Sequence, residues 1–201
     1  MYKLFLLFFL SYFLGSIPFA LLIALPKGVD PRKEGSKNPG ATNVTRLLGK
    51  KWGFFTFIGD SSKGILALFI AYSFFVNKIP YSKDLILAGT AFFAVLGHLF
   101  SIFLKFKGGK GVATTIGVFL ILTPKAMVLS LIIFLIAVFL FNYISIGSLL
   151  ATALLPLNIY FLHYPPEYVI CSLALAILIW IKHKDNIKRL IKGEEKTWQK
   201  V

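Results

Sequence analysis

Long apolar runs separated by short polar segments dominate the chain. The runs cover Leu4–Leu25, Trp52–Val76, Leu85–Leu104, Val112–Thr123, Ala126–Phe141, Ile144–Leu162 and Tyr168–Ile181. Several of them approach the roughly 20 residues that a helix needs to cross about 30 Å of hydrocarbon. Because they lack the period-two alternation of barrel strands, the pattern predicts a helical membrane protein.

The number of spans depends on Thr123-Pro124-Lys125, which either separates two short spans or kinks one long helix. With seven spans and the N-terminus outside, 17 of the 22 Lys and Arg residues fall in cytoplasmic segments, chiefly 26–51, 105–111 and 182–201. With six spans, basic segments would lie on opposite faces, against the positive-inside bias. We therefore predict an all-α integral membrane protein, a single membrane domain over residues 1–201, with seven transmembrane helices and a cytoplasmic C-terminus.

Composition narrows the class of protein further. The 201 residues are 57% hydrophobic and 15% charged, against about 25% charged in an ordinary soluble domain. This excludes a soluble globular enzyme and a disordered tail, and the lone Cys171 excludes an intrachain disulfide. The net charge of +14 indicates a basic surface beside the lipid bilayer or anionic substrates. Nucleic acid is not an expected partner, because the basic residues follow membrane topology.

The first polar segment, residues 35–46, predicts a turn followed by a short helix. Asn38-Pro39-Gly40 favours a tight turn in which Gly40 takes a positive φ. Thr42 or Asn43 is then expected to cap the helix. A capped helix start beside a glycine turn directs backbone N–H groups at one point and attracts anions.

Two side chains of this segment suit phosphate chemistry. Ser36 offers a hydroxyl group, and Arg46 offers a planar guanidinium that matches phosphate geometry. The alternative interpretation is a basic cytoplasmic loop that only meets lipid headgroups.

The second polar segment, Lys105-Phe106-Lys107-Gly108-Gly109-Lys110-Gly111, combines three glycines with three lysines. Glycines allow the backbone to fold into an anion-binding nest, and the lysines supply charge. A nucleotide P-loop is excluded because Gly111 follows Lys110 where Ser or Thr is needed. The segment therefore favours phosphate without a nucleotide, with a flexible basic hairpin as the alternative.

The third polar segment is the tail from residue 182. His183 and Asn186 are three residues apart and share a helix face with Leu190, which turns that face toward protein. A second, basic face suits the membrane surface; its residues are Lys184, Lys188 and Lys192. His183 and Asn186 could orient a hydroxyl or a phosphate, although a histidine satisfied by its surroundings is the alternative.

Three acidic, basic or histidine residues fall inside the predicted spans. Asp60 and Lys63 are spaced i, i+3 and either form a structural ion pair or serve function, because intramembrane charges are costly. His98 is more typical of a hydrogen bond between helices than of a catalyst. The sequence has no Cys/His cluster, and we predict neither a metal site nor a cofactor.

Together these segments resemble the bacterial acyl-phosphate:glycerol-3-phosphate acyltransferases, the PlsY family. The resemblance covers nearly the whole chain, as several short motifs in one order. They are Gly15-Ser16-Ile17-Pro18; Gly35-Ser36-x-Asn38-Pro39-Gly40-Ala41-Thr42-Asn43 with Arg46; Asp60-x-x-Lys63-Gly64; Gly97-His98; Phe106-Lys107-Gly108-Gly109-Lys110-Gly111; and His183-x-x-Asn186-Ile187-x-Arg189-Leu190 with Gly193-x-Glu195. Two positions depart from the family pattern: Lys37 replaces a small residue, and Ser101 stands where proline is common.

The resemblance implies a bacterial enzyme of the cytoplasmic (inner) membrane with its active site facing the cytoplasm. It would transfer a fatty acyl group from acyl phosphate to glycerol 3-phosphate, giving lysophosphatidic acid and phosphate for phospholipid synthesis. Neither a metal nor acyl-CoA is implied. The resemblance leaves room for a soluble partner enzyme that produces the acyl phosphate.

Residue roles follow from the resemblance and from the chemistry of two phosphorylated substrates. The expected catalytic residues are Ser36, His183 and Asn186. The residues expected to bind glycerol 3-phosphate are Ser36, Arg46, Lys105, Lys107, His183 and Asn186. Those expected to bind acyl phosphate are Asn38, Gly40, Thr42, Asn43, Gly108, Gly109, Lys110 and Gly111. A structural role is expected for Asp60, Lys63 and Glu195.

This hypothesis requires the three polar segments to meet at the inner leaflet. The alternative function is a membrane carrier of anions or phosphate compounds. A carrier should place polar groups near the membrane midplane, and only Asp60 and Lys63 favour it. A lipid-binding scaffold, the third possibility, would tolerate the loss of Ser36.

Overall fold

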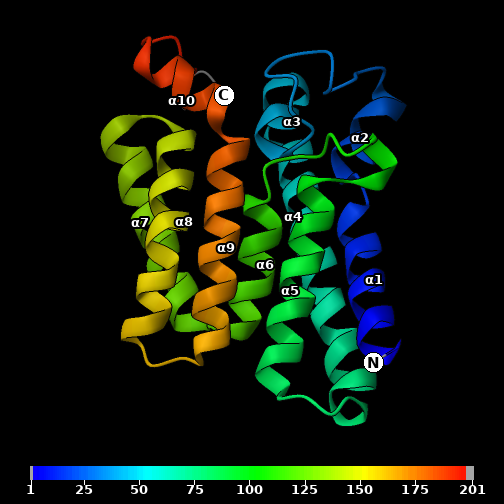
Figure 1. Cartoon of the computed structure of the whole chain (residues 1–201). Coiled ribbons are helices and arrows are strands. Elements are labelled where there is room, and N and C mark those ends of the chain that lie inside the picture. Colours follow the sequence, from blue (N-terminus) through cyan, green and yellow to red (C-terminus); the bar gives the residue numbers. More distant parts are fainter. Residues whose placement is uncertain (1, 198–201) are drawn as a thin grey trace. The chain divides into compact units, whose positions relative to one another are not determined.

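The computed structural model describes residues 2–197, and every regular element within them is helical (Figure 1). The chain divides into two compact units, unit 1 ending at Val118 and unit 2 beginning at Phe119. Each unit is built from helices packed on their sequence neighbours. The sequence expectation of one membrane domain over residues 1–201 stays a prediction.

Unit 1 contains six helices and several short turns of helix. The helices are α1 (Tyr2–Ser16), α2 (Phe19–Ala24), α3 (Ala41–Leu48), α4 (Lys50–Ile70), α5 (Lys83–Leu99) and the start of α6 (Val112–Leu122). The short elements are the 3₁₀ turns η1 (Leu25–Lys27), η3 (Val76–Lys78) and η4 (Ile102–Leu104), and the π-helical turn η2 (Ala71–Phe75). Unit 2 contains α7 (Pro124–Phe141), α8 (Ile144–Phe161), α9 (Pro166–Lys182) and α10 (Lys184–Ile191).

Five stretches of the described residues are long and apolar enough to cross a bilayer. They are Tyr2–Lys27, Lys50–Lys78, Lys83–Leu104, Pro124–Phe141 and Ile144–Phe161. A sixth arises if α9 and α10, bent by 58°, count as one span. The expectation of a multi-pass helical membrane protein is thus confirmed.

The predicted fourth span corresponds to α6, which has 11 residues. At 1.5 Å per residue this helix is about 16 Å long, about half the hydrocarbon thickness. The predicted break is confirmed, because α6 ends at Leu122 and α7 begins at Pro124, a residue that suits a first helical position. Seven spans and the orientation of the termini stay predictions.

Glycines bring α1 and α5 of unit 1 into direct backbone contact. A Cβ atom at Gly97 would collide with the carbonyl oxygen of Tyr12, and one at Gly15 with the carbonyl oxygen of Ala94. In lipid, burying apolar surface does not drive helices together, so they associate through close packing. Small residues such as glycine make this close packing possible. Ser101, at the position that departs from the family pattern, donates its hydroxyl to the carbonyl of Ser16 at 2.6 Å.

A small apolar cluster supports the polar loops at one end of unit 1. It joins Ala20 and Leu21 of α2, Val44 of α3 and Leu104 of η4. Val44 is fully buried, so α3 packs on α2 through this side chain. The first polar segment and the residue just before the second one therefore pack on the same apolar cluster.

Glu195 fastens the tail of unit 2. Its Oε1 accepts hydrogen bonds from Asn186 Nδ2 at 2.6 Å and from Ser145 Oγ at 3.1 Å. Its Oε2 accepts from Arg189 Nε at 2.6 Å. These contacts tie the residues after α10 to α10 itself and to the start of α8, which suits the structural role expected of Glu195.

The α1–α5 contact predicts different effects for two glycines of α5. Gly97→Ala should lower the midpoint of thermal denaturation, because overpacking against a rigid backbone carbonyl costs roughly 1–3 kcal/mol. Gly89→Ala is the matched control, since its Cβ would meet only the ring tip of Phe8, which can rotate away. Thermal denaturation of both purified variants in detergent checks this. Equal midpoints for the two variants would contradict the packing argument.

Candidate functional site

Asn43 organises the loop that carries Ser36. The Asn43 Oδ1 accepts a hydrogen bond from the backbone N–H of Ser36 at 2.8 Å. Its Nδ2 donates to the carbonyl oxygens of Pro31 at 2.9 Å and Glu34 at 3.0 Å. Because this carboxamide is 1% exposed and bonded on both sides, it fixes the backbone of Ser36 relative to α3.

The start of α3 differs from the sequence prediction. The N-cap residue is Gly40, and no side chain caps the helix. The expected cap by Thr42 or Asn43 is therefore wrong. Asn43 does not cap the helix because it lies two residues inside it and uses its carboxamide to hold the preceding loop.

The turn at residues 38–40 forms as predicted, with different backbone angles. Gly40 N–H donates to the carbonyl of Asn38 at 3.0 Å, which closes a tight turn. Gly40 itself is extended, with φ −154°, so the expected positive φ there is wrong. Positive φ values occur earlier, at Gly35 (+65°) and Lys37 (+56°). At Gly35 a Cβ would also collide with the Asn43 Oδ1.

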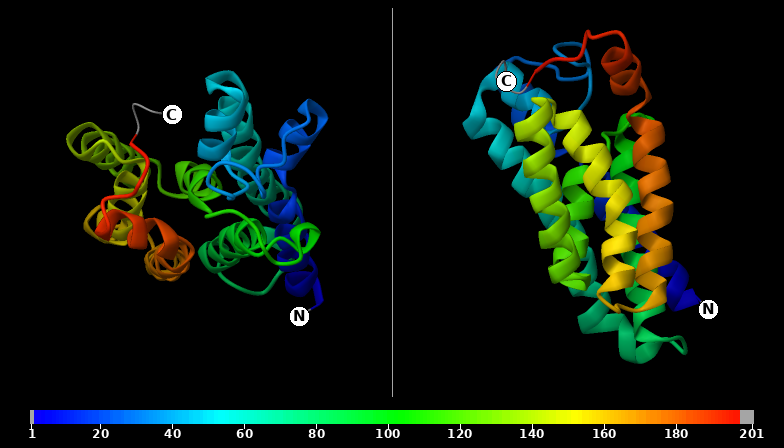
Figure 2. Two further views of the ribbon diagram at one scale, coloured as in Figure 1. Left: turned by 90° about the horizontal axis from the view of Figure 1, so that it is seen from above. Right: turned by 90° about the vertical axis from the view of Figure 1, so that its left-hand side faces the viewer.

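The glycine-rich segment lies against the end of α5 and against this turn. Gly109 N–H donates to the carbonyl of His98 at 3.1 Å, and a Cβ at Gly108 would collide with the same oxygen. A Cβ at Gly109 would collide with His98 Nε2 and would lie 3.0 Å from the carbonyl oxygen of Pro39. Unit 1 therefore brings the first two polar segments together, at the same end of the unit (Figures 1 and 2).

Beneath this contact lies a buried cluster of three ionisable side chains. Asp60, Lys63 and His98 are 2%, 3% and 7% exposed. The Lys63 Nζ lies 3.0 Å from Asp60 Oδ1, 2.8 Å from His98 Nδ1 and 3.0 Å from the carbonyl oxygen of Ile17. The expected ion pair and the expected helix-to-helix bond of His98 are confirmed. The Lys63 ammonium thus has one partner for each of its three hydrogens.

Sequence reasoning missed the contact between His98 and the glycine-rich segment. The signal for it was the Gly97-His98 pair at the end of an apolar run, directly upstream of residues 105–111. Periodicity assigned His98 to a helix face but could not say that the following loop folds back over it.

Two arginines near the first segment have different surroundings. Arg32 donates to both carboxylate oxygens of Asp30, from Nε and Nη2 at 2.9 Å each. These hydrogen bonds hold the pKa of Asp30 at about 2, well below its usual value of 3.8. Arg46 lies half-buried in the last turn of α3. The charge of Arg32 is therefore matched within its own loop by Asp30.

His183 and Asn186 occupy the junction of α9 and α10 in unit 2, and both are buried. The His183 Nδ1 lies 2.8 Å from the carbonyl oxygen of Ile179. A carbonyl can only accept, so Nδ1 carries a hydrogen, and in a neutral ring the lone pair would lie on Nε2. Asn186 directs its amide nitrogen at Glu195. The inward-facing orientation predicted for these two side chains is confirmed.

The predicted site residues thus fall in both units. Unit 1 carries Ser36, Asn38, Gly40, Thr42, Asn43, Arg46, Lys105, Lys107, Gly108, Gly109, Lys110 and Gly111, with the cluster of Asp60, Lys63 and His98. Unit 2 carries His183, Asn186 and Glu195. The meeting of the third segment with the first two stays a prediction. Within residues 2–197, no group of His, Cys, Asp and Glu could hold a metal ion.

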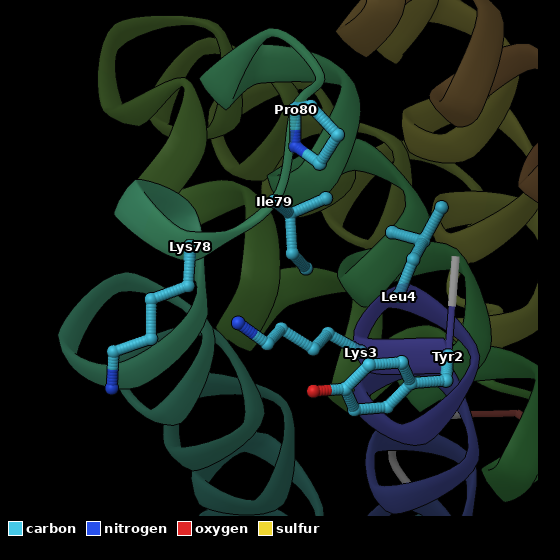
Figure 3. Close-up of a pocket in the computed structure, with 6 residues that line it drawn as sticks. All are labelled: Tyr2, Lys3, Leu4, Lys78, Ile79 and Pro80. Carbon is cyan, nitrogen blue, oxygen red and sulfur yellow. The ribbon is translucent and has the colours of Figure 1, made fainter.

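A pocket of about 210 Å³ lies at the other end of unit 1 (Figure 3). It is lined by Tyr2, Lys3, Leu4, Lys78, Ile79 and Pro80. These residues belong to the start of α1 and to the connection between α4 and α5. None of the six is a predicted site residue, so this pocket is separate from the polar segments.

Comparisons with known proteins agree with these motifs. A family described as glycerol-3-phosphate acyltransferase matches residues 5–193. The glycerol-3-phosphate acyltransferase of Desulfotalea psychrophila is 50% identical over 193 residues, 95% of this chain and 96% of its own length. That of Trichlorobacter lovleyi is 43% identical over 189 residues, 94% of each chain.

Two solved structures share the fold. The crystal structure of PlsY, an integral membrane glycerol 3-phosphate acyltransferase, in its glycerol 3-phosphate form has a TM-score of 0.88 at 38% identity, and covers 96% of this chain and 94% of its own. The lysophosphatidic acid form of PlsY has a TM-score of 0.86 at the same identity. With identity this high over nearly the whole length, this chain belongs to the glycerol-3-phosphate acyltransferase (PlsY) family of integral membrane enzymes.

Proposed function

We propose that this enzyme transfers a fatty acyl group from acyl phosphate to glycerol 3-phosphate. The observation that carries this proposal is the contact of the glycine-rich segment with the turn at residues 38–40 in unit 1. It joins two segments of unit 1 that carry glycines, Ser36, Arg46 and lysines, a combination that suits phosphorylated substrates.

The reaction needs no covalent enzyme intermediate, because an acyl phosphate is already activated. A hydroxyl oxygen of glycerol 3-phosphate attacks the carbonyl carbon of the donor. The bond between that carbon and the bridging phosphate oxygen breaks, and phosphate leaves with the electron pair. The hydroxyl proton passes to a base, and the products are lysophosphatidic acid and phosphate.

We assign each substrate phosphate to the residues of unit 1 that suit its binding. Arg46, Lys105 and Lys107 hold the phosphate of glycerol 3-phosphate. The turn and the glycine-rich segment hold the phosphate of the donor through Asn38, Thr42, Gly108, Lys110 and Gly111. Gly40 and Gly109, first expected to bind it as well, shape the two loops instead, because their N–H groups donate to the carbonyls of Asn38 and His98. In place of the donor contact first expected of Asn43, we assign it the positioning of Ser36, because its carboxamide is bonded to the loop backbone.

Ser36, His183 and Asn186 orient the attacking hydroxyl. In His183 the lone pair lies on Nε2, since Nδ1 donates to Ile179, and this nitrogen suits a proton acceptor. A substrate phosphate, with a second pKa near 6, is the alternative acceptor.

The same proposal includes the topology. Seven spans with the N-terminus outside place 17 of the 22 Lys and Arg residues on the cytoplasmic side, in agreement with the positive-inside bias. This orientation puts the active site on the cytoplasmic face of the bacterial inner membrane, where soluble glycerol 3-phosphate and a soluble donor-producing enzyme would meet it.

The first prediction concerns the donor. Purified enzyme with palmitoyl phosphate and glycerol 3-phosphate should release phosphate, whereas palmitoyl-CoA in place of the donor should yield no acylated product. Ser36→Ala should abolish most of the turnover, and Ser73→Ala, an exposed serine in η2, is the control. Phosphate release at the uncatalysed rate by the unmodified enzyme would reject the proposed donor.

The second prediction separates two arginines. Arg46→Gln should raise the KM for glycerol 3-phosphate by about 10- to 100-fold, because a charge-assisted hydrogen bond contributes roughly 1.5–3 kcal/mol. Arg32→Gln removes the same charge from the neighbouring loop, yet it should leave KM nearly unchanged because Arg32 is bound to Asp30. Equal effects of the two substitutions would point to general electrostatic attraction instead of a specific contact.

The third prediction concerns the proton acceptor. If His183 is the base, His183→Ala should lower kcat by about 10²–10⁴-fold, the usual contribution of general base catalysis. A turnover close to that of the unmodified enzyme would exclude His183 and leave the substrate phosphate as the acceptor. Steady-state phosphate release at saturating substrate measures this.

A further inference from the structure

The buried cluster of Asp60, Lys63 and His98 takes no part in the reaction as proposed, although charges inside a membrane protein are costly. The Lys63 ammonium has three hydrogens and lies within 3.0 Å of three acceptors, on Asp60, His98 and Ile17. An ammonium group can only donate. The His98 Nδ1 therefore accepts, and the hydrogen of the neutral ring lies on Nε2.

The ring of His98 is thus held from one side by α4. Asp60 and Lys63 are one helical turn apart on α4, whereas His98 lies in the last turn of α5. The Asp60 Oδ1 is also 3.4 Å from His98 Nδ1. Lys63 therefore orients the ring by donating to Nδ1, and Asp60 acts on the ring through Lys63, which it holds in place.

The other side of the ring faces the glycine-rich segment. The position that a Cβ of Gly109 would occupy coincides with the edge of His98 at Nε2 and lies 3.0 Å from the Pro39 carbonyl oxygen. The backbone of the same histidine accepts the Gly109 N–H. His98 therefore touches the segment with both its ring and its carbonyl, at the place where Gly109 meets the turn at residues 38–40.

We propose that Asp60, Lys63 and His98 are positioning residues that set the register of the glycine-rich segment against the turn at residues 38–40. His98 is the contact, and the ion pair holds its ring in place. The proposal rests on the proposed function in one respect, since it takes these two loops as the phosphate-binding elements. None of the three side chains needs to touch a substrate.

A pair of substitutions at one position tests the proposal. In His98→Asn the side-chain oxygen can replace Nδ1 as the acceptor for Lys63, but nothing reaches the position of Nε2. In His98→Gln the side chain is long enough to bring its amide to the Nε2 edge. The two variants have similar polarity, so they differ mainly in contact with the segment.

Two readouts are measured on each purified variant. The first is steady-state phosphate release. Here His98→Asn should raise the KM of a phosphorylated substrate about tenfold or more, with a much smaller change in kcat. A tenfold rise in KM corresponds to the loss of about one hydrogen bond to a charged group. The second is the rate of tryptic cleavage after the exposed Lys107, followed by mass spectrometry, which should rise because cleavage requires local opening of the segment. His98→Gln should restore both values toward those of the unmodified enzyme.

Unchanged KM and unchanged cleavage in His98→Asn would overturn the proposal, as would equal losses in both variants, which would indicate a merely structural histidine. If His98→Asn does not fold, Asp60→Asn combined with Lys63→Gln removes both charges together. That variant should show the same rise in KM and in cleavage, and normal values there would also overturn the proposal. Tryptic cleavage needs no activity, so it tests the positioning role even if the unmodified enzyme fails to use acyl phosphate.

Discussion

The packing of unit 1 depends on the hydrogen-bond partners of one buried positive charge, the ammonium group of Lys63. Pro18 interrupts the first span, and the carbonyl of Ile17 at that break accepts two hydrogen bonds, from the Phe19 N–H at 3.2 Å and from Lys63 Nζ at 3.0 Å. Lys63 in turn contacts the carboxylate of Asp60 and the ring of His98. A single ammonium group therefore connects the end of α1 with α4 and α5. Removing any partner would leave a buried charge or dipole unmatched, which costs far more than an exposed pair gains.

Contacts with buried side chains hold the two polar loops of unit 1 in place. Gly108 and Gly109 carry no Cβ because the backbone and ring of His98 occupy that space. Ser36 is held by Asn43, a buried side chain that bonds to the loop at three points. Loops on a membrane surface usually move more than the helices they join. In this unit, hydrogen bonds from buried side chains and close glycine packing fix them.

Unit 2 uses the same principle with different residues. Glu195 accepts a hydrogen bond from Asn186 and also binds Arg189 and Ser145, so a buried carboxylate sets the direction of the Asn186 amide. The carbonyl of Ile179 assigns the hydrogen of His183 to Nδ1. Both buried polar side chains at the junction of α9 and α10 are therefore oriented by hydrogen bonds to neighbouring groups.

The sequence by itself determined the class of the protein, because apolar runs of this length have few folded solutions outside a bilayer. It also determined the break at Pro124, the Asp60–Lys63 pair and the buried face of His183 and Asn186, since proline chemistry and helical spacing are local properties. Only the tertiary structure decided that Gly40 starts α3 without a side-chain cap, that the positive φ values fall at Gly35 and Lys37, and that His98 supports Gly109. Those features depend on which carbonyl or ring another segment brings into contact, and periodicity along one segment carries no information about its neighbours in space.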